Sequence, residues 1–147
     1  SGTFGGESLS LAACIATIKK IKEKKIIPYL YEYNNKLTKL INKNIKENDL
    51  DKYMCLKTSG PRSIIFFNSK NELLNRKRKT IMMQEFIKNK LLYFGINMPS
   101  YSHKVKELDF TSFAFKKIMP KLSEIYKNKN ENQFIDGGII KPIFRQR

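Results

Sequence analysis

The sequence has very few of the residues from which metal sites and disulfide frameworks are built. It contains two cysteines, one histidine and no tryptophan in 147 residues. Cys14 and Cys55 lie far apart, so there is no CxxC pair and no cluster of Cys and His at metal-binding spacing. We therefore expect no metal site and no disulfide-stabilised scaffold.

Long apolar runs are also missing. There is no stretch of about 18 consecutive apolar residues, which a membrane-spanning helix would require. The first six residues lack the basic and apolar regions of a secretory signal peptide. We expect no membrane partner and a cytoplasmic location. The chain also lacks an initiator methionine, which hints at a start within a longer protein.

Acidic residues are scarce relative to basic ones, and the formal net charge is +16. Such a charge is typical of proteins that bind nucleic acid or anionic membranes. However, 24 of the 29 basic residues are lysines, and they occur in every segment. Phosphate-clamping surfaces favour arginine, because its planar guanidinium forms paired hydrogen bonds. We expect the charge to lie on solvated faces and nucleic acid not to be the partner. A stand-alone basic module that binds nucleic acid or another polyanion is the alternative.

Apolar residues make up 41% of the chain, enough for the core of one ordinary domain. Their spacing switches between the helical and the strand period. Gly60-Pro61 marks a turn, Gly95 is expected to end a helix, and Pro120 is expected to kink or break one. The predicted elements are helices over 8–27 and 28–46, strands over 52–58 and 63–68, a helix over 72–93, a short strand over 96–101 and a helix over 105–127.

This order of elements predicts an α+β fold. We expect a short, mainly antiparallel sheet with helices on one face, preceded by a long N-terminal helical segment. The first helix is too apolar to be stable in water alone, and we expect it to pack on something outside the sheet layer. The predicted division is a loop and helix over 1–27, belonging to or bridging from a large domain, and a small domain over 28–147.

A glycine-rich loop, Gly2-Thr3-Phe4-Gly5-Gly6, precedes the first helix. Glycines allow close approach of an anion, and a helix N-terminus favours phosphate. The pattern is weak alone, because such loops also serve as plain turns. Glu7 would compete for the same helix dipole.

Five segments in register resemble class III pyridoxal-phosphate aminotransferases, particularly the branch near glutamate-1-semialdehyde aminomutase. The resemblance begins with the segment over 1–13 and spans essentially the whole chain. The other four segments are Gly60-Pro61-Arg62 with Phe66-Phe67, Met83-Gln84-Glu85-Phe86 with Leu92-Tyr93-Phe94-Gly95, Ser100-Tyr101-Ser102-His103, and Ile140-Lys141-Pro142-Ile143-Phe144-Arg145.

The resemblance implies the C-terminal small domain of a fold type I homodimer that uses pyridoxal 5'-phosphate to act on a small-molecule amino donor and acceptor. In that family the cofactor lysine lies upstream of the segment matching Gly2-Thr3, so this chain would supply no catalytic residue and be inactive alone. The threonine matching Thr3 contacts the cofactor phosphate of the neighbouring subunit, and Gly2 would add a backbone contact.

Three other positions bear on function. Arg62 follows the turn and is a candidate for binding a substrate carboxylate, with a solvated strand-edge arginine as the alternative. His103 is expected to be structural. The family often has a helix-capping threonine where this chain has Lys104. Together with Pro120, this departure leaves open a non-catalytic remnant whose apolar first helix drives association.

Overall fold

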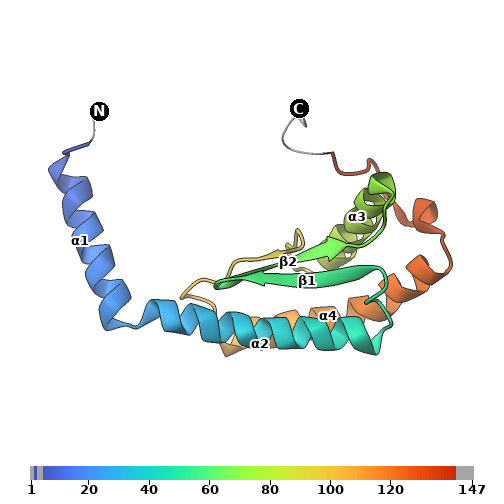
Figure 1. Cartoon of the computed structure of the whole chain (residues 1–147), viewed down its shortest axis with the longest axis horizontal. Coiled ribbons are helices and arrows are strands. Elements are labelled where there is room, and N and C mark those ends of the chain that lie inside the picture. The colour runs from blue at the N-terminus through green and yellow to red at the C-terminus, as the bar shows by residue number, and fades with distance from the viewer. Residues whose placement is uncertain (1, 3–4, 142–147) are drawn as a thin grey trace.

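The computed structural model describes residue 2 and residues 5–141, and it confirms the α+β class (Figure 1). Four helices, a three-stranded antiparallel sheet and one short 3-10 helix follow one another. In chain order they are α1 (Ser8–Glu23), α2 (Ile26–Glu47), β1 (Met54–Ser59), β2 (Arg62–Phe67), α3 (Glu72–Lys88), β3 (Ile96–Asn97), α4 (Val105–Lys127) and the 3-10 helix η1 (Glu131–Phe134).

The sheet has the strand order β1-β2-β3, and both neighbouring pairs are antiparallel. The β1–β2 register pairs Met54 with Phe67 and Leu56 with Ile65. Because side chains alternate between the two faces of a strand, these four residues share one face. Met54 and Ile65 on that face are buried, whereas Phe66 on the opposite face is 44% exposed. The helices therefore cover one face of the sheet, as predicted.

The core lies between this face of the sheet and helices α2, α3 and α4. Helix α2 packs against α4, β1 and β2, and α3 packs against α4 and β2. Phe86 of α3 stacks on Phe115 of α4 with ring centroids 4.7 Å apart, and Tyr93 joins both rings. The α4 residues Ala114, Phe115, Ile118, Met119, Leu122, Ile125 and Tyr126 form the buried stripe that the spacing of apolar residues predicts.

A buried ion pair joins α3 to η1 at one end of the core. Arg78 Nε donates to Glu131 Oε1 at 3.0 Å, and both side chains are less than 10% exposed. The Arg78 guanidinium also lies 4.8 Å from the ring centroid of Tyr53 and 5.2 Å from that of Tyr126. The two rings and the carboxylate together compensate for burying the arginine.

Helix α1 differs from the rest of the fold because none of its residues is buried. It ends at Glu23, and Lys25 adopts a left-handed conformation with φ 47° before α2 begins. In Figure 1, α1 leaves the start of α2 at a steep angle and stands apart from the sheet and α4. Its packing within the described chain is against α2. Among the described residues, no helix is long and apolar enough to cross a membrane.

Three local predictions need correction. Helix α3 ends at Lys88, because Leu91 and Tyr93 leave the helix axis to pack against the core. Gly95 therefore does not end that helix. It has φ +82° beside β2, where its carbonyl accepts from Ile65 N at 2.7 Å.

A Cβ at Gly95 would lie 3.3 Å from Met82 Cε, a tight contact that adds to the strain of its positive φ. The strand after it is shorter than predicted and spans only Ile96–Asn97. Helix α4 continues through Pro120 without a break, and the proline is exposed. Its missing amide removes one hydrogen bond from α4 without ending the helix.

Candidate functional site

The loop before α1 is closed by a carboxylate from the same chain. Glu7 is the N-cap residue of α1, and its side chain accepts hydrogen bonds from Leu9 N at 3.0 Å and Ser10 N at 2.7 Å. The Ser10 hydroxyl also donates to Glu7. These hydrogen bonds, the one from the Ser10 side chain first, lower the pKa of Glu7 below its usual value. Two amides at the start of α1 are therefore already paired and are not free to bind an anion.

The segment before Glu7 uses one further amide internally, because Gly5 N donates to Gly2 O at 3.0 Å. A Cβ placed at Gly2 or Gly6 would meet no atom within 4 Å. Packing within the described chain therefore does not explain glycine at these two positions. Thr3, the residue predicted to contact a cofactor phosphate, lies outside the described residues. Three amides at this end of the chain, those of Gly5, Leu9 and Ser10, are thus already hydrogen-bonded within the chain.

Arg62 is the first residue of β2 and lies directly after the Gly60-Pro61 turn. It pairs with Ser59 across the hairpin, and its side chain is exposed. Among the described residues, no carboxylate forms an ion pair with it. The hairpin turn and the loop carrying Gly2 lie in different parts of the molecule (Figure 1). Within one copy of the chain, Arg62 at the hairpin turn thus lies apart from the start of α1.

The structure contains a groove that sequence reasoning missed. Its volume is about 1300 Å³, and it lies between α3, the segment over 91–99, the first turns of α4 and the N-terminal half of α2. The lining is mainly apolar, with Leu92, Phe94, Ile96, Met98 and Phe110 among its residues. The only signal in the sequence was the dense apolar run over 91–98 between two helices.

The floor of this groove carries a small polar cluster. Asn97 Nδ2 donates to Ser63 Oγ at 3.0 Å, and Ser63 Oγ donates to Asn34 Oδ1 at 3.3 Å. All three side chains are buried. The hydroxyl of Tyr93 is buried beside Asn97, and burial raises the pKa of Tyr93 above its usual range. This cluster ties α2 to β2 and β3.

His103 lies just before α4 and also lines the groove, and a structural role for it stays a prediction. Its Nδ1 accepts from Ser100 N at 3.2 Å, and its ring centroid lies 6.0 Å from that of Tyr33. Lys104 follows at the N-cap of α4, and its backbone N donates to Glu107 Oε2 at 2.8 Å. This backbone hydrogen bond, the largest cause, lowers the pKa of Glu107. Glu107 therefore provides a capping hydrogen bond at the start of α4.

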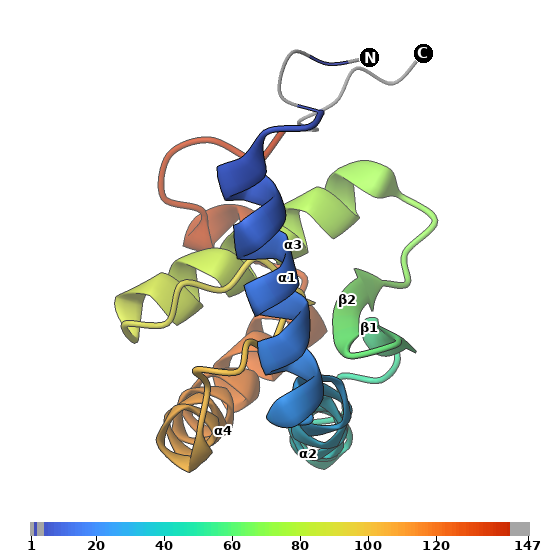
Figure 2. The ribbon, with the colours of Figure 1, turned by 90° about the vertical axis from the view of Figure 1, so that its left-hand side faces the viewer.

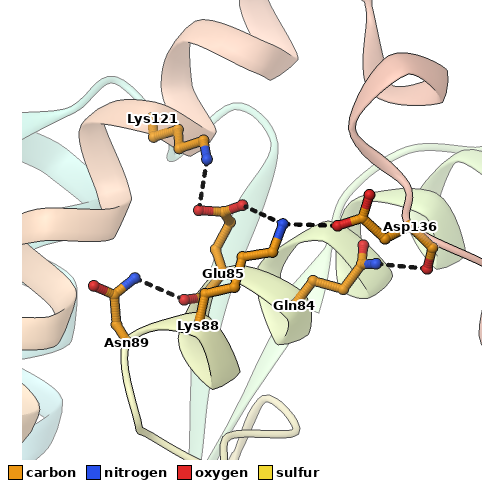
Figure 3. A network of polar contacts seen from close by, with 6 residues as sticks. All are labelled: Gln84, Glu85, Lys88, Asn89, Lys121 and Asp136. Carbon is orange, nitrogen blue, oxygen red and sulfur yellow. Dashed lines mark hydrogen bonds and ion pairs between the residues drawn. The ribbon is translucent and has the colours of Figure 1, made fainter.

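A charged network connects α3, α4 and the segment after η1 (Figure 3). The carboxylate of Glu85 is buried and accepts from Lys121 Nζ at 2.8 Å, and Lys88 Nζ lies 3.7 Å away. Lys88 Nζ also contacts Asp136 Oδ2 at 2.7 Å, and this hydrogen bond raises the pKa of Lys88. The raised pKa favours the cationic form of Lys88, which disfavours Lys88 as a covalent cofactor-binding residue.

The described residues contain no group of three His, Cys, Asp or Glu side chains placed to hold a metal ion. Comparison of the chain with protein-family models and with curated protein sequences finds no match to either.

Proposed function

We propose that this chain is the C-terminal part of a class III pyridoxal-phosphate-dependent aminotransferase or aminomutase. In this proposal Gly2 and Thr3 bind the cofactor phosphate of a neighbouring subunit, and Arg62 binds a substrate carboxylate. The lysine that holds the cofactor is contributed by a segment upstream. The proposal rests on the five segments in register that resemble this family.

Two neighbouring features of the structure support the proposal. They are the space around the glycines before α1 and the exposed surface of α1 itself. The space around Gly2 and Gly6 is compatible with a phosphate approaching from outside the chain. Helix α1 has no buried residue, as expected of an element whose packing partner is another domain or subunit. The cofactor, when bound, supplies the electron sink for proton transfer beside the substrate amine. The residues of this chain would anchor its phosphate and form part of the substrate wall.

The proposal is tested in the full-length enzyme that contains this chain. Thr3→Val should raise the dissociation constant for pyridoxal phosphate about tenfold or more, because a hydrogen bond to a charged group is lost. Thr3→Ser should retain the hydroxyl and most of the affinity. Thr17→Val is the matched control, because the Thr17 hydroxyl donates only to Ala13 O within α1.

Pyridoxal, which lacks the phosphate, provides the second control ligand. Its affinity should be the same for the Thr3→Val variant and the unmodified enzyme. Equal losses for pyridoxal and pyridoxal phosphate would refute a phosphate contact at Thr3. A reading frame without a lysine-bearing cofactor segment upstream of Ser1 would refute the family assignment.

The net charge of +16 is the observation that favours the alternative, a stand-alone polyanion-binding module. Several lysines are paired within helices, such as Lys36 with Glu32 and Lys43 with Glu47. A polyanion-binding module should bind single- or double-stranded nucleic acid with an affinity that falls steeply as salt rises. Sequence-selective binding that survives moderate salt would favour this alternative over the enzyme.

A further inference from the structure

The groove described above combines an apolar wall with several cations. The apolar wall is formed by the segment over 91–99 and the start of α4, where Leu92, Met98 and Phe110 are 72%, 69% and 42% exposed. In Figure 2 this segment, drawn in yellow, runs between α3 and α4. The basic side chains that line the same groove are Arg76, Lys79, Lys106 and Lys141. The lining is therefore amphipathic.

Three of these cations gather around one turn of α3. Arg76 and Lys79 are three residues apart in the helix, so their side chains leave the same face. The segment after η1 returns to this turn, because Ile140 N donates to Thr80 Oγ1 at 3.1 Å. Lys141 follows directly and lines the groove with the other two. Arg76, Lys79 and Lys141 thus form a cation cluster where α3 borders the groove.

The cations of the groove lack counterions. Within the described part of the chain, no carboxylate forms an ion pair with any of the four. Arg76 and Lys79 are only partly exposed, and Arg76 Nε is buried without a hydrogen-bond partner among the described residues. The carboxylates that line the groove are Glu72 and Glu107, and Glu107 already accepts from Lys104 N at 2.8 Å. Cations that are partly removed from water without a counterion favour an anion bound beside them.

The cation cluster meets the apolar wall at Gly95. A Cβ placed at Gly95 would lie 3.9 Å from Lys79 Cε, so the side chain of Lys79 passes close to this residue. The neighbours of Gly95 are Phe94 and Ile96, which line the groove and are 48% and 44% exposed. A ligand whose anionic group contacts Lys79 can therefore place an apolar body against Phe94 and Ile96.

The groove is larger than a compact metabolite requires. Its volume is about 1300 Å³, whereas pockets for small ligands usually enclose about 300–1,000 Å³. The α3 residues that line it run from Glu72 to Met83, which at about 1.5 Å per residue corresponds to a length of about 16 Å. A ligand with an extended apolar chain and one charged end fits these dimensions better than a compact polar ligand does.

We propose that the groove binds a free amphiphilic anion, a long unbranched hydrocarbon chain that ends in one carboxylate. The cation cluster holds the carboxylate, and the hydrocarbon chain lies against the apolar wall. Three of the four cations gather at a single turn of α3, which fits one head group better than the several spaced carboxylates of an acidic peptide. The inference goes beyond the proposed pyridoxal-phosphate function and does not rest on it.

Isothermal titration calorimetry of the 147-residue chain with dodecanoate, below its micelle-forming concentration, tests the proposal. Dodecanoate should bind saturably, with one molecule per chain. Dodecanol and dodecylamine have the same hydrocarbon chain with a neutral or a positive head group, and each should bind at least about tenfold more weakly. Acetate has the head group without the chain and should show no saturable binding in the same concentration range.

Two matched pairs of variants locate the site. Lys79→Gln should weaken dodecanoate binding about tenfold and leave dodecanol binding unchanged, whereas Lys79→Arg should retain most of the affinity. Lys77→Gln is the control, because Lys77 belongs to the same helix but does not line the groove. Phe110→Gln should weaken dodecanoate and dodecanol alike, by about fivefold. Its control is Phe66→Gln, which changes a phenylalanine of similar exposure on the open face of the sheet.

Circular dichroism establishes that each variant is folded, and Lys141→Gln replaces Lys79→Gln if the latter unfolds. Equal affinity for dodecanoate and dodecanol would overturn the proposal, because the cations would then contribute nothing. Equal weakening by Lys77→Gln and Lys79→Gln would also overturn it, since the anion would then respond only to the net charge of the chain. Binding only to anionic vesicles, or only to an acidic amphipathic peptide, would assign the groove to a different occupant.

These outcomes are separate from the test of the proposed function. The phosphate contact at Thr3 is measured with pyridoxal phosphate in the full-length enzyme, whereas the groove is measured with dodecanoate on this chain. Failure of dodecanoate to bind would therefore overturn the groove proposal and leave the phosphate contact unaffected.

Discussion

Helices α1 and α4 are both well formed, yet their environments are opposite. Helix α4 buries Phe115, Ile118 and Leu122 along one stripe, while α1 buries no residue. The difference follows from the distribution of apolar residues. In α4 they repeat at spacings of three and four with lysines between them, whereas in α1 they surround the helix over residues 8–18. Helix α4 is thus matched to the core of this chain, and α1 is matched to a surface outside it.

An isoleucine-to-alanine change should alter the free energy of unfolding very differently in α4 and in α1, and this is the largest effect we expect. Ile118→Ala should lower the free energy of unfolding by about 2–5 kcal/mol, because the side chain is 1% exposed in the core. Ile15→Ala in dilute protein should have almost no effect, because that side chain is 68% exposed. Urea denaturation at low concentration measures both. A similar loss for both variants would mean that α1 is packed within a single chain.

The buried ion pair gives the next largest effect. Glu131→Gln should lower the free energy of unfolding by about 2–3 kcal/mol, because Arg78 would stay buried without a countercharge. Asp49→Asn is the matched control, because its pair with Lys127 is exposed and should matter little. Thermal unfolding of both variants checks this prediction. Equal melting temperatures would show that the two tyrosine rings alone compensate for the charge of Arg78.

Pro120 offers a smaller change in the opposite direction. Pro120→Ala should raise the free energy of unfolding by about 1 kcal/mol. The change restores a backbone hydrogen-bond donor within α4. The stability gained from this donor exceeds the stability lost because alanine restricts the unfolded chain less than proline does. The position is exposed, so no cavity is created. Chemical denaturation measures the change, and a loss of stability would indicate that α4 depends on a bend at this residue.

The smallest effect concerns the pH dependence of α1. Hydrogen bonds from Ser10 and Leu9 hold the pKa of Glu7 below its usual value of 4.5. Since the folded pKa is lower than the unfolded one, this cap stabilises α1 above the unfolded pKa. The contribution is lost as pH falls through the folded pKa. Chemical shifts of the Leu9 and Ser10 amides should report fraying at acid pH. Glu7→Gln should show weaker capping already at neutral pH, and identical acid titrations of both proteins would contradict a role for Glu7.

The sequence predicted the helices best where apolar spacing is regular. The bounds of α4 were predicted without error, and α2 was predicted within a few residues. The end of α3 was missed because Leu91–Phe94 continue its apolar pattern and Gly95 looks like a helix stop. Tertiary packing of Tyr93 against Phe86 and Phe115 decides that boundary.

The groove could not be predicted from spacing at all. It forms where residues of α2, α3, α4 and the segment over 91–99 converge, and these are far apart in the sequence. The contact of Glu7 with the start of α1 was predicted, because it depends on residues adjacent in the chain. The predicted separation into regions 1–27 and 28–147 stays a prediction.

The most direct test of the central claim is amide hydrogen exchange, measured residue by residue in dilute protein. The claim is that α4 is held by the core of this chain, whereas α1 is not covered by the described part of it. It predicts that amides of α1 exchange rapidly and that the core amides of α4 are protected. Equal protection of the α1 and α4 amides would contradict the claim.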